Sequence, residues 1–366
     1  MLLKRLTVGL LMLGLFVMSG MMGMGQSNEP PGSKILMKMA EPYTPDKSLA
    51  DDYRCFLVNP NLTEDVFVTA YQIYPGQEHL VHHVILFVAN ASAIPQAEAT
   101  DRSVSGPGWT CFSGPEVAGA GSLSTSLGVW APGTSSTTFP MGTAKKLKAG
   151  AQLIMQVHYN VMGGEVADDV TQVELSTSSD TSLKLLSAHQ VLSAVEIRCP
   201  GAYPTETSDR CHRAYAQKQV EDPGVNESLH QACGTNSGFY TNRDVGVGDA
   251  QDVSCKMFVR RESIGLGAFG HMHLHGKSLK VVLNPDTAGA KIILDIPGWN
   301  FKRQEQYWFD EQVPLHVGDI LEITCVYDNS GPILGPDGLP MEPRYIIWGE
   351  GTTDEMCLAL INWIVP

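Results

Sequence analysis

Short strand-like runs separated by turn residues recur along almost the whole chain. Each run is rich in Val, Ile, Thr and aromatic residues and is bounded by Gly, Pro, Asn or Asp. The runs are DVFVTAYQIY, HHVILFV, AQLIMQVHYNV, TQVELSTSS, SLKVVLNP, AKIILDIP, DILEITCVYD and YIIWGEG. Long amphipathic helical periodicity is largely absent, and the best helix candidate is the region 210–232. The pattern predicts an all-β fold of antiparallel, jelly-roll-like β-sandwiches rather than alternating βα units.

The length of the chain suits two such sandwiches in tandem. With 366 residues, 43% of them hydrophobic, about two domains can each bury a core. A polar segment, MGGEVADD at 162–169, is the predicted boundary between an N-terminal domain at 34–165 and a C-terminal domain at 170–366. Within the second domain, 199–255 is polar, contains Gly and holds four cysteines, which favours a cross-linked, partly helical insertion.

The first residues have the composition of an export signal. Lys4 and Arg5 precede an apolar stretch rich in Leu, Val and Met, and small residues follow. This order predicts a signal peptide at 1–25, with a retained N-terminal anchor as the alternative. We therefore expect a secreted or periplasmic, extracytoplasmic protein with no stable membrane insertion after the signal is removed.

Cysteine number and net charge narrow the classes of partner. An even set of eight cysteines behind an export signal favours disulfides, and the absence of a CxxC pair disfavours a thiolate zinc site. Three pairings are possible among the four cysteines of the insertion, which are Cys199, Cys211, Cys233 and Cys255. A formal net charge of -14 disfavours nucleic acid, because nucleic acid selects basic patches. Metal ligands are therefore sought among the histidines and methionines.

The stretch HMHLH places His271, His273 and His275 at alternate positions. On a strand, side chains two residues apart project from the same face, so these imidazoles point into one volume, as a metal requires. Imidazole suits zinc, copper, iron and nickel, so the spacing indicates a metal without naming it. The alternative is a solvated polar face of a strand.

The stretch HLVHH is less specific in isolation. Strand alternation sends His82 and His83 to opposite faces, which favours one surface residue and one hydrogen-bonded core residue. Both can bind one metal only if the strand is bulged or ends there. In isolation His158, in QVHY, and Met356, in DEMC, are interpreted as core residues, and His79 as a surface residue.

In this order, the motifs VHH, QVHY, HMHLHGK and DEMC together resemble the copper type II, ascorbate-dependent monooxygenase family, which includes peptidylglycine α-hydroxylating and dopamine β-monooxygenases. The resemblance begins in MKMAEPYTPDKSLADDYRCFLV and continues through GDILEITCVYDNS and WGEGTTDEMC. It implies two β-sandwich domains, each with one copper, and an active site between them. It also implies dioxygen as a substrate and ascorbate as the reductant.

The resemblance assigns ligands residue by residue. It implies an electron-transfer copper on three histidines and a catalytic copper on two histidines and a soft thioether, a donor that stabilises Cu(I). The implied ligands are His82, His83 and His158 for the first copper and His271, His273 and Met356 for the second. His275 has no ligand counterpart and is expected either to support a ligand from behind or to be exposed. The resemblance also implies the disulfides Cys55–Cys111 and Cys325–Cys357.

Departures from the family concern the substrate. In the peptide-amidating member, an arginine, an asparagine and a tyrosine grip a peptide carboxylate, but the corresponding stretches here read GAFGHMH and MCLALIN. Phe269, Leu358 and Leu360 stand where polar groups would be needed, so a carboxylate would lack a bidentate partner. Gln156 matches a family residue near the cleft and is expected to bind substrate or water. We expect an apolar or aromatic small molecule.

These expectations amount to a two-copper monooxygenase that hydroxylates a C–H bond of such a molecule with dioxygen and a one-electron reductant such as ascorbate. One alternative is a non-catalytic, exported copper-binding protein. Another is a zinc hydrolase built on the HxH histidines and a distant histidine, with Glu350 or Glu355 as general base, which leaves VHH and QVHY unexplained. The oligomeric state is not predicted.

Overall fold

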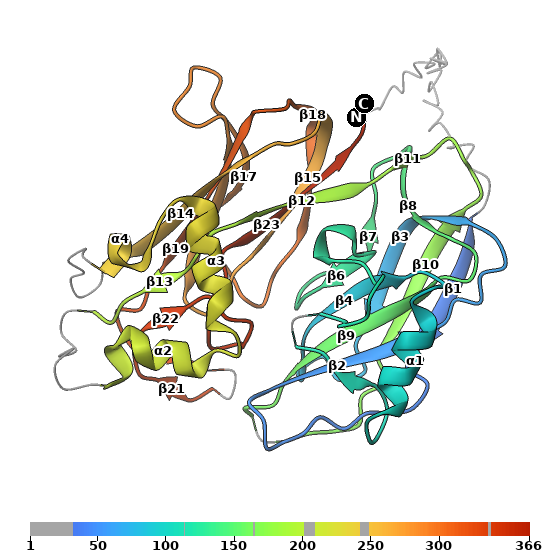
Figure 1. Ribbon diagram of the computed structural model, residues 1–366, viewed down its shortest axis with the longest axis horizontal. Coiled ribbons are helices and arrows are strands. Elements are labelled where there is room, and N and C mark those ends of the chain that lie inside the picture. The colour runs from blue at the N-terminus through green and yellow to red at the C-terminus, as the bar shows by residue number, and fades with distance from the viewer. Residues whose placement is uncertain (1–31, 113, 164, 201–208, 242–248, 336–337) are drawn as a thin grey trace, which may run out of the picture. The chain divides into compact units, whose positions relative to one another are not determined.

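The computed structural model describes residues 32–112, 114–163, 165–200, 209–241, 249–335 and 338–366. The predicted signal peptide at 1–25 lies outside these residues. Residues 32–366 form one compact unit, and its secondary structure is mostly antiparallel sheet (Figure 1), so the predicted all-β fold is confirmed. No helix among the described residues is long and apolar enough to cross a membrane.

The strands before residue 186 form two sheets. One has the order β1-β10-β3-β8-β11, with β7 also paired to β3. Its strands are β1 Ser33–Lys38, β3 Val66–Tyr74, β7 Thr137–Thr138, β8 Thr143–Leu147, β10 Gln172–Ser178 and β11 Lys184–Leu185. The other has the order β5-β2-β9-β4-β6. Its strands are β2 Asp51–Val58, β4 Val81–Ala89, β5 Trp109–Thr110, β6 Gly128–Trp130 and β9 Gln152–Asn160.

We call residues 32–186 the first half and 187–366 the second half. Because β10 pairs with β1 and β3, the predicted boundary at 162–169 lies inside the first half. The division into two domains stays a prediction. The connections of the first half contain the helix α1 Ile94–Arg102 and the short 3-10 helix η1 Leu123–Thr125.

The second half contains two four-stranded sheets and two short strand pairs. The sheets have the orders β12-β23-β15-β18 and β14-β19-β16-β17. Their strands are β12 Ser187–Leu192, β14 Gln251–Phe258, β15 Ser263–His271, β16 Gly276–Leu283, β17 Lys291–Ile296, β18 Gln306–Leu315, β19 Ile320–Tyr327 and β23 Leu358–Ile364. The short pairs are β13 Glu196–Ile197 with β22 Ile346–Ile347 and β20 Ile333–Leu334 with β21 Pro340–Met341.

Each half buries an apolar core between its sheets. In the first half Leu86 of β4 and Met155 of β9 are fully buried, and in the second half Val281 and Ile323 are. The hydrophobic effect of burying such side chains contributes about 1.5–3 kcal/mol each. Ile364, at the end of β23, packs into the core of the first half, so apolar contacts join the two halves.

The region 210–232, predicted as one helix, forms two. They are α2 Arg213–Gln219 and α3 Pro223–Cys233, preceded by η2 Asp209–Cys211 and followed by α4 Ser237–Thr241. The Asp222 side chain caps α3 by accepting the Gly224 N–H at 2.8 Å. Pro223 occupies the first turn of α3, where its missing N–H costs nothing, but it cannot continue a preceding helix.

A buried carboxylate holds this helical region onto the strands. Glu196 of β13 accepts hydrogen bonds from four side chains, which are those of Arg213, Asn226, His230 and Tyr345. Burial opposes ionisation of Glu196, but the hydrogen bonds from His230, Arg213 and Tyr345 outweigh it and lower the pKa of its carboxyl. The network therefore stabilises Glu196 as a carboxylate.

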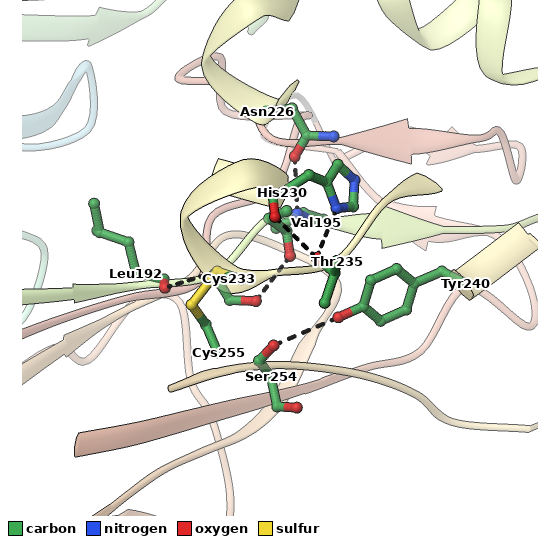
Figure 2. Close-up of a disulfide and its surroundings, with 11 residues drawn as sticks. Leu192, Val195, Asn226, His230, Cys233, Thr235, Tyr240, Ser254 and Cys255 are labelled. Atoms are coloured by element: carbon green, nitrogen blue, oxygen red, sulfur yellow. Dashed lines mark hydrogen bonds between the residues drawn. A yellow bond between two sulfur atoms is a disulfide. The ribbon is translucent and has the colours of Figure 1, made fainter. Parts of the chain in front are cut away.

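Four disulfides cross-link the described residues. They are Cys55–Cys111, Cys199–Cys211, Cys233–Cys255 and Cys325–Cys357. Two of these pairs are the ones that the family resemblance implied, and the other two select one of the three pairings left open for the insertion. Figure 2 shows that Cys233–Cys255 ties the end of α3 to β14, beside the carbonyl of Leu192.

Candidate metal centre

Three histidines of the first half converge on one point. The Nδ1 atom of His82 lies 2.7 Å from that of His158 and 3.3 Å from that of His83, and the His83 and His158 Nδ1 atoms are 3.4 Å apart. Nitrogen ligands bound at about 2.0–2.1 Å to one metal lie roughly 3.3–3.5 Å apart, so two of the three separations match a common ion. Within the described residues these three side chains form a group able to hold a metal ion.

A break in the register of β4 places the neighbouring histidines together. In the pairing with β9, Val81 lies opposite Tyr159 whereas His83 lies opposite His158, so His82 is an additional residue. Val81 and Val84 both face the same core, although side chains three residues apart on a regular strand point to opposite faces. The alternation of side chains is therefore shifted by one residue at His82. The condition set by the sequence, a bulged strand at VHH, is therefore met.

His82 and His83 are neutral, and His158 is oriented by its neighbours. Burial lowers the pKa of His82 and His83 well below the ordinary value, so their ring nitrogens keep a lone pair for a metal. His158 Nε2 donates to Asp51 Oδ1 at 2.8 Å, which leaves the lone pair of Nδ1 available for a metal. The Tyr53 ring stacks on His158 with centroids 3.9 Å apart.

In the second half, His271 and His273 use Nδ1 for contacts within the protein and leave Nε2 available for a metal. His271 ends β15, and its Nδ1 donates to Gln304 Oε1 at 2.7 Å. His273 Nδ1 lies 3.2 Å from the Asp354 carbonyl oxygen, and its buried Nε2 has no hydrogen-bond partner among the described residues. Burial lowers the pKa of His271 to about 4 and that of His273 well below its ordinary value. Neutral imidazoles with a free Nε2 suit a metal.

Met356 lies two residues before β23 and lines the same cavity as His271. Its carbonyl accepts the Tyr327 hydroxyl at 2.8 Å, and the next residue, Cys357, is tied to Cys325 of β19. These bonds fix the backbone beside the thioether. Two imidazoles and one thioether form a donor set that fits copper, and Cu(I) in particular.

The two groups of histidines lie next to each other. Ring centroids are 5.4 Å apart for His82 and His273 and 6.4 Å apart for His83 and His271. Phe301 of the second half stacks on His82 with a centroid separation of 5.0 Å. The candidate ligands from both halves therefore share one buried region.

A cavity of about 560 Å³ opens beside both groups. Its walls come from β4, β6 and β9 of the first half and β12, β15 and β23 of the second. The cavity is lined by all four residues predicted to contact substrate, which are Gln156, Phe269, Leu358 and Leu360. The Gln156 amide nitrogen donates to the carbonyls of Cys111 and Phe112. The amide oxygen, Oε1, takes no part in these two hydrogen bonds.

Two further predictions about histidines have clear outcomes. His79 is exposed, as expected. His275, for which no ligand role was predicted, is buried with its Nδ1 3.6 Å from Glu355 Oε1. Glu355 also accepts the backbone N–H groups of His273, His275 and Met356 at 2.8, 2.5 and 3.3 Å. Its carboxylate organises the ligand backbone, which disfavours its use as the general base of a hydrolase.

Sequence reasoning missed the supporting residues Asp51, Gln304 and Tyr53. Asp51 and Tyr53 stand in LADDYRC, a stretch noted for its resemblance and its cysteine, but no motif pairs either with His158. Gln304 lies between β17 and β18 in a stretch without any noted pattern. Their roles follow from contacts made only in the folded chain.

Comparison with known proteins gives one informative match. Residues 250–364 match the family model for the copper type II ascorbate-dependent monooxygenase C-terminal domain. No match was found among curated proteins.

Solved structures give weak likenesses only. The chain is similar to the VP2 subviral particle of infectious bursal disease virus (7% identity, 91% of this chain and 71% of that one, TM-score 0.21). It is similar to a Paenibacillus xanthan lyase (10% identity, 90% and 25%, TM-score 0.19). It is also similar to a fucolectin from striped bass (Morone saxatilis) serum (9% identity, 92% and 97%, TM-score 0.17). These TM-scores are too low to indicate a shared fold or function.

The matched segment runs from just before β14 to the end of β23 and contains His271, His273 and Met356. The resemblance seen in the four motifs and the match of this segment agree. The part of the chain from residue 250 to residue 364 is therefore similar to the C-terminal domain of copper type II ascorbate-dependent monooxygenases, the family that the four motifs resemble.

Proposed function

We propose that the chain is an exported monooxygenase that binds two copper ions and hydroxylates a C–H bond of a small apolar or aromatic molecule. One observation supports this most directly: a single cavity is bordered by His83 of one ligand group and by His271 and Met356 of the other. When bound, copper supplies dioxygen binding and one-electron transfer. The balanced reaction is R–H + O₂ + 2e⁻ + 2H⁺ → R–OH + H₂O, and a reductant such as ascorbate supplies the electrons one at a time.

The cavity lining supports the substrate class. Most of its side chains are apolar, with Phe87, Phe269 and Trp348 as aromatic examples. Apart from histidines, the ionisable residues of the lining are two acids, Glu116 and Glu350, and among the described residues the lining contains no Lys or Arg. A carboxylate substrate would meet acidic side chains and find no bidentate cation, so a neutral, apolar molecule fits better than a glycine-terminated peptide.

The chain's own residues bind and orient in this proposal. The apolar walls exclude water and hold the substrate beside His271 and Met356. Gln156 Oε1 accepts a hydrogen bond from a hydroxyl of the substrate or product, because both protons of its amide are already used.

The test combines a copper count with oxygen uptake under ascorbate, using a panel of aromatic, aliphatic and glycine-terminated peptide substrates. We expect two coppers per chain and oxygen uptake with an aromatic or aliphatic compound. Met356→Ala should abolish uptake while the three-histidine site keeps its copper, because only the second site loses a ligand. Met341→Ala, a methionine of β21 outside the cavity lining, is the matched control and should behave as the unmodified chain.

Several outcomes would contradict the proposal. A single copper with Met356 dispensable would remove the second site. Full copper loading without oxygen uptake on any substrate would favour a copper-holding protein, and zinc in the protein as isolated, with no copper signal after loading, would favour a hydrolase. Preference for glycine-terminated peptides would overturn the substrate class. N-terminal sequencing of the exported chain tests the signal peptide.

A further inference from the structure

We propose that each half of the chain orients a metal-binding histidine of the other half, through one hydrogen-bonded intermediary in each direction. The intermediaries are Asp51 and Gln304, which are positioning residues. The inference rests on the copper sites proposed above, but its contacts all join described side chains.

The first route runs from the second half to His158. Asp51, at the start of β2, accepts His158 Nε2 at 2.8 Å on Oδ1, and the same oxygen accepts the Thr352 hydroxyl at 2.6 Å. Asp51 Oδ2 accepts the Thr352 backbone N–H at 3.2 Å. Thr352 is fully buried, so water does not compete for these bonds. The carboxylate that fixes the His158 ring is thus itself fixed by the second half.

A neighbouring bond holds the same segment in place. The Tyr53 hydroxyl, on the ring that stacks on His158, donates to the Glu350 carbonyl at 2.6 Å. Residues 350–352 are therefore attached to β2 at two points. Met356 follows four residues after Thr352, so one short segment connects the first ligand group to the thioether of the second.

The second route runs from the first half to His271. Gln304 is buried; its Nε2 donates to the Phe301 carbonyl at 3.0 Å, so its Oε1 accepts the His271 Nδ1–H at 2.7 Å. The backbone of Gln304 is held by the first half, because its carbonyl accepts the Thr134 hydroxyl at 2.7 Å and its N–H donates to Pro132 at 3.2 Å.

A glycine allows this approach between the halves. Gly133 has a φ of +85°, which side-chain-bearing residues rarely adopt, and a Cβ atom there would lie 2.8 Å from the Lys302 carbonyl oxygen. The loop of Ala131 to Thr134 can therefore lie directly against residues 302–304. Phe301, two residues before Arg303, stacks on His82 and adds a direct contact between the halves.

The physical consequence is mutual dependence of the two sites. A hydrogen bond to the distal nitrogen of a ligating histidine fixes its tautomer and ring direction, and loss of such a partner lowers metal affinity by about 10–100-fold. Here each partner is in turn fixed by the opposite half. A change in one half should therefore alter the metal site of the other.

The first experiment is Thr352→Val in the full chain, with Thr353→Val as the matched control, because no described hydrogen bond joins the Thr353 side chain to Asp51. We expect Thr352→Val to change the Cu(II) EPR parameters of the three-histidine site and to lower its copper affinity about 10-fold or more. Thr353→Val should leave both unchanged, and Thr352→Ser, which keeps the hydroxyl, should restore them. Equal effects of the two valine variants, or no restoration by serine, would overturn the first route.

The reciprocal experiment is Thr134→Val, with exposed Ser135→Ala as its control. We expect Thr134→Val to lower Cu(I) affinity at the site of His271 and Met356 about 10-fold or more, while the EPR signal of the three-histidine site is retained. Unchanged Cu(I) affinity, or the same loss in Ser135→Ala, would overturn the second route.

A copper-free measurement separates this inference from the proposed function. In the metal-free chain, ¹⁵N NMR of histidine should show the proton of His158 on Nε2 and that of His271 on Nδ1. Thr352→Val should alter the first signal and Thr134→Val the second; unaltered signals would overturn the inference. A chain that binds no copper but shows these shifts would refute the proposed function alone.

Discussion

The disulfide Cys325–Cys357 offers a quantitative test of how the fold supports Met356. It joins β19 to the residue after Met356, and both cysteines are fully buried. Its sequence separation of 32 corresponds to about 4 kcal/mol of stabilisation by restriction of the unfolded chain. The double variant Cys325→Ala/Cys357→Ala should lose this free energy of unfolding. It should also bind Cu(I) about 10-fold or more weakly at the second site, because the backbone beside the thioether is released.

The matched control is Cys199→Ala/Cys211→Ala, which removes a disulfide with a sequence separation of 12, worth about 3 kcal/mol. It should lose similar stability and keep its Cu(I) affinity. Urea unfolding of the metal-free chain measures stability without a contribution from copper binding, and competition with a chromophoric chelator measures Cu(I) affinity. Equal losses of Cu(I) affinity in the two double variants would refute the reasoning, since a general destabilisation would then account for both.

The partly buried Glu350 and the buried Glu196 give predictions of opposite sign. Burial raises the pKa of Glu350 from 4.5 to about 7, so the folded chain binds a proton that the unfolded chain has released, and stability falls as pH rises between these values. In Glu350→Gln the free energy of unfolding should fall less with rising pH, by up to about 3 kcal/mol. The same pH dependence in the variant and the unmodified chain, measured by urea unfolding, would contradict this prediction. The pKa of Glu196 is lowered, so its contribution is present above the unfolded pKa of 4.5 and is lost as pH falls through the folded value. Glu196→Gln should cost about 3–5 kcal/mol near neutral pH while both coppers are retained, and loss of copper in a folded variant would contradict the separation of this network from the metal centre.

Alternating, β-branched strands could be predicted from the sequence, and Gly-rich or fully buried ones could not. The runs containing β3, β9 and β19 agree with the structure to within one or two residues at each end. β15, with the sequence SIGLGAFGH, was not predicted because its glycines weaken strand propensity. The structure needs one of them: a Cβ on Gly267 would lie 2.4 Å from the Trp308 ring.

β23 was missed for a different reason. All of its residues from Leu358 to Ile364 are buried, so its sequence lacks the apolar and polar alternation of a strand with one solvent face. YIIWGEG was predicted as a strand, but only Ile346 and Ile347 form a strand there, and Trp348 makes an isolated bridge with Glu355. The polar turn that follows supplies Glu350 and Thr352 to contacts with the first half.

The candidate site also contains residues that could be predicted from the sequence and residues that could not. The six proposed ligand residues could be named because their types and order match a family motif by motif. The residues that orient them could not, because Asp51 lies 107 positions before His158, and Gln304 lies 33 positions after His271. Such contacts depend on strand pairing and on the approach of two loops, which no local pattern encodes.

The extra residue in β4 makes the metal centre sensitive to chain length rather than to side-chain chemistry alone. Deleting a single residue at His82 would restore an unbroken ladder with β9 and leave a more regular strand. His83 would then follow Val81 directly, and only one histidine could face the cavity. A one-residue deletion upstream of β4 would leave the pairing with β9 unchanged and keep the two proposed ligands together. The deletion at His82, a few positions away, would separate them from one metal site.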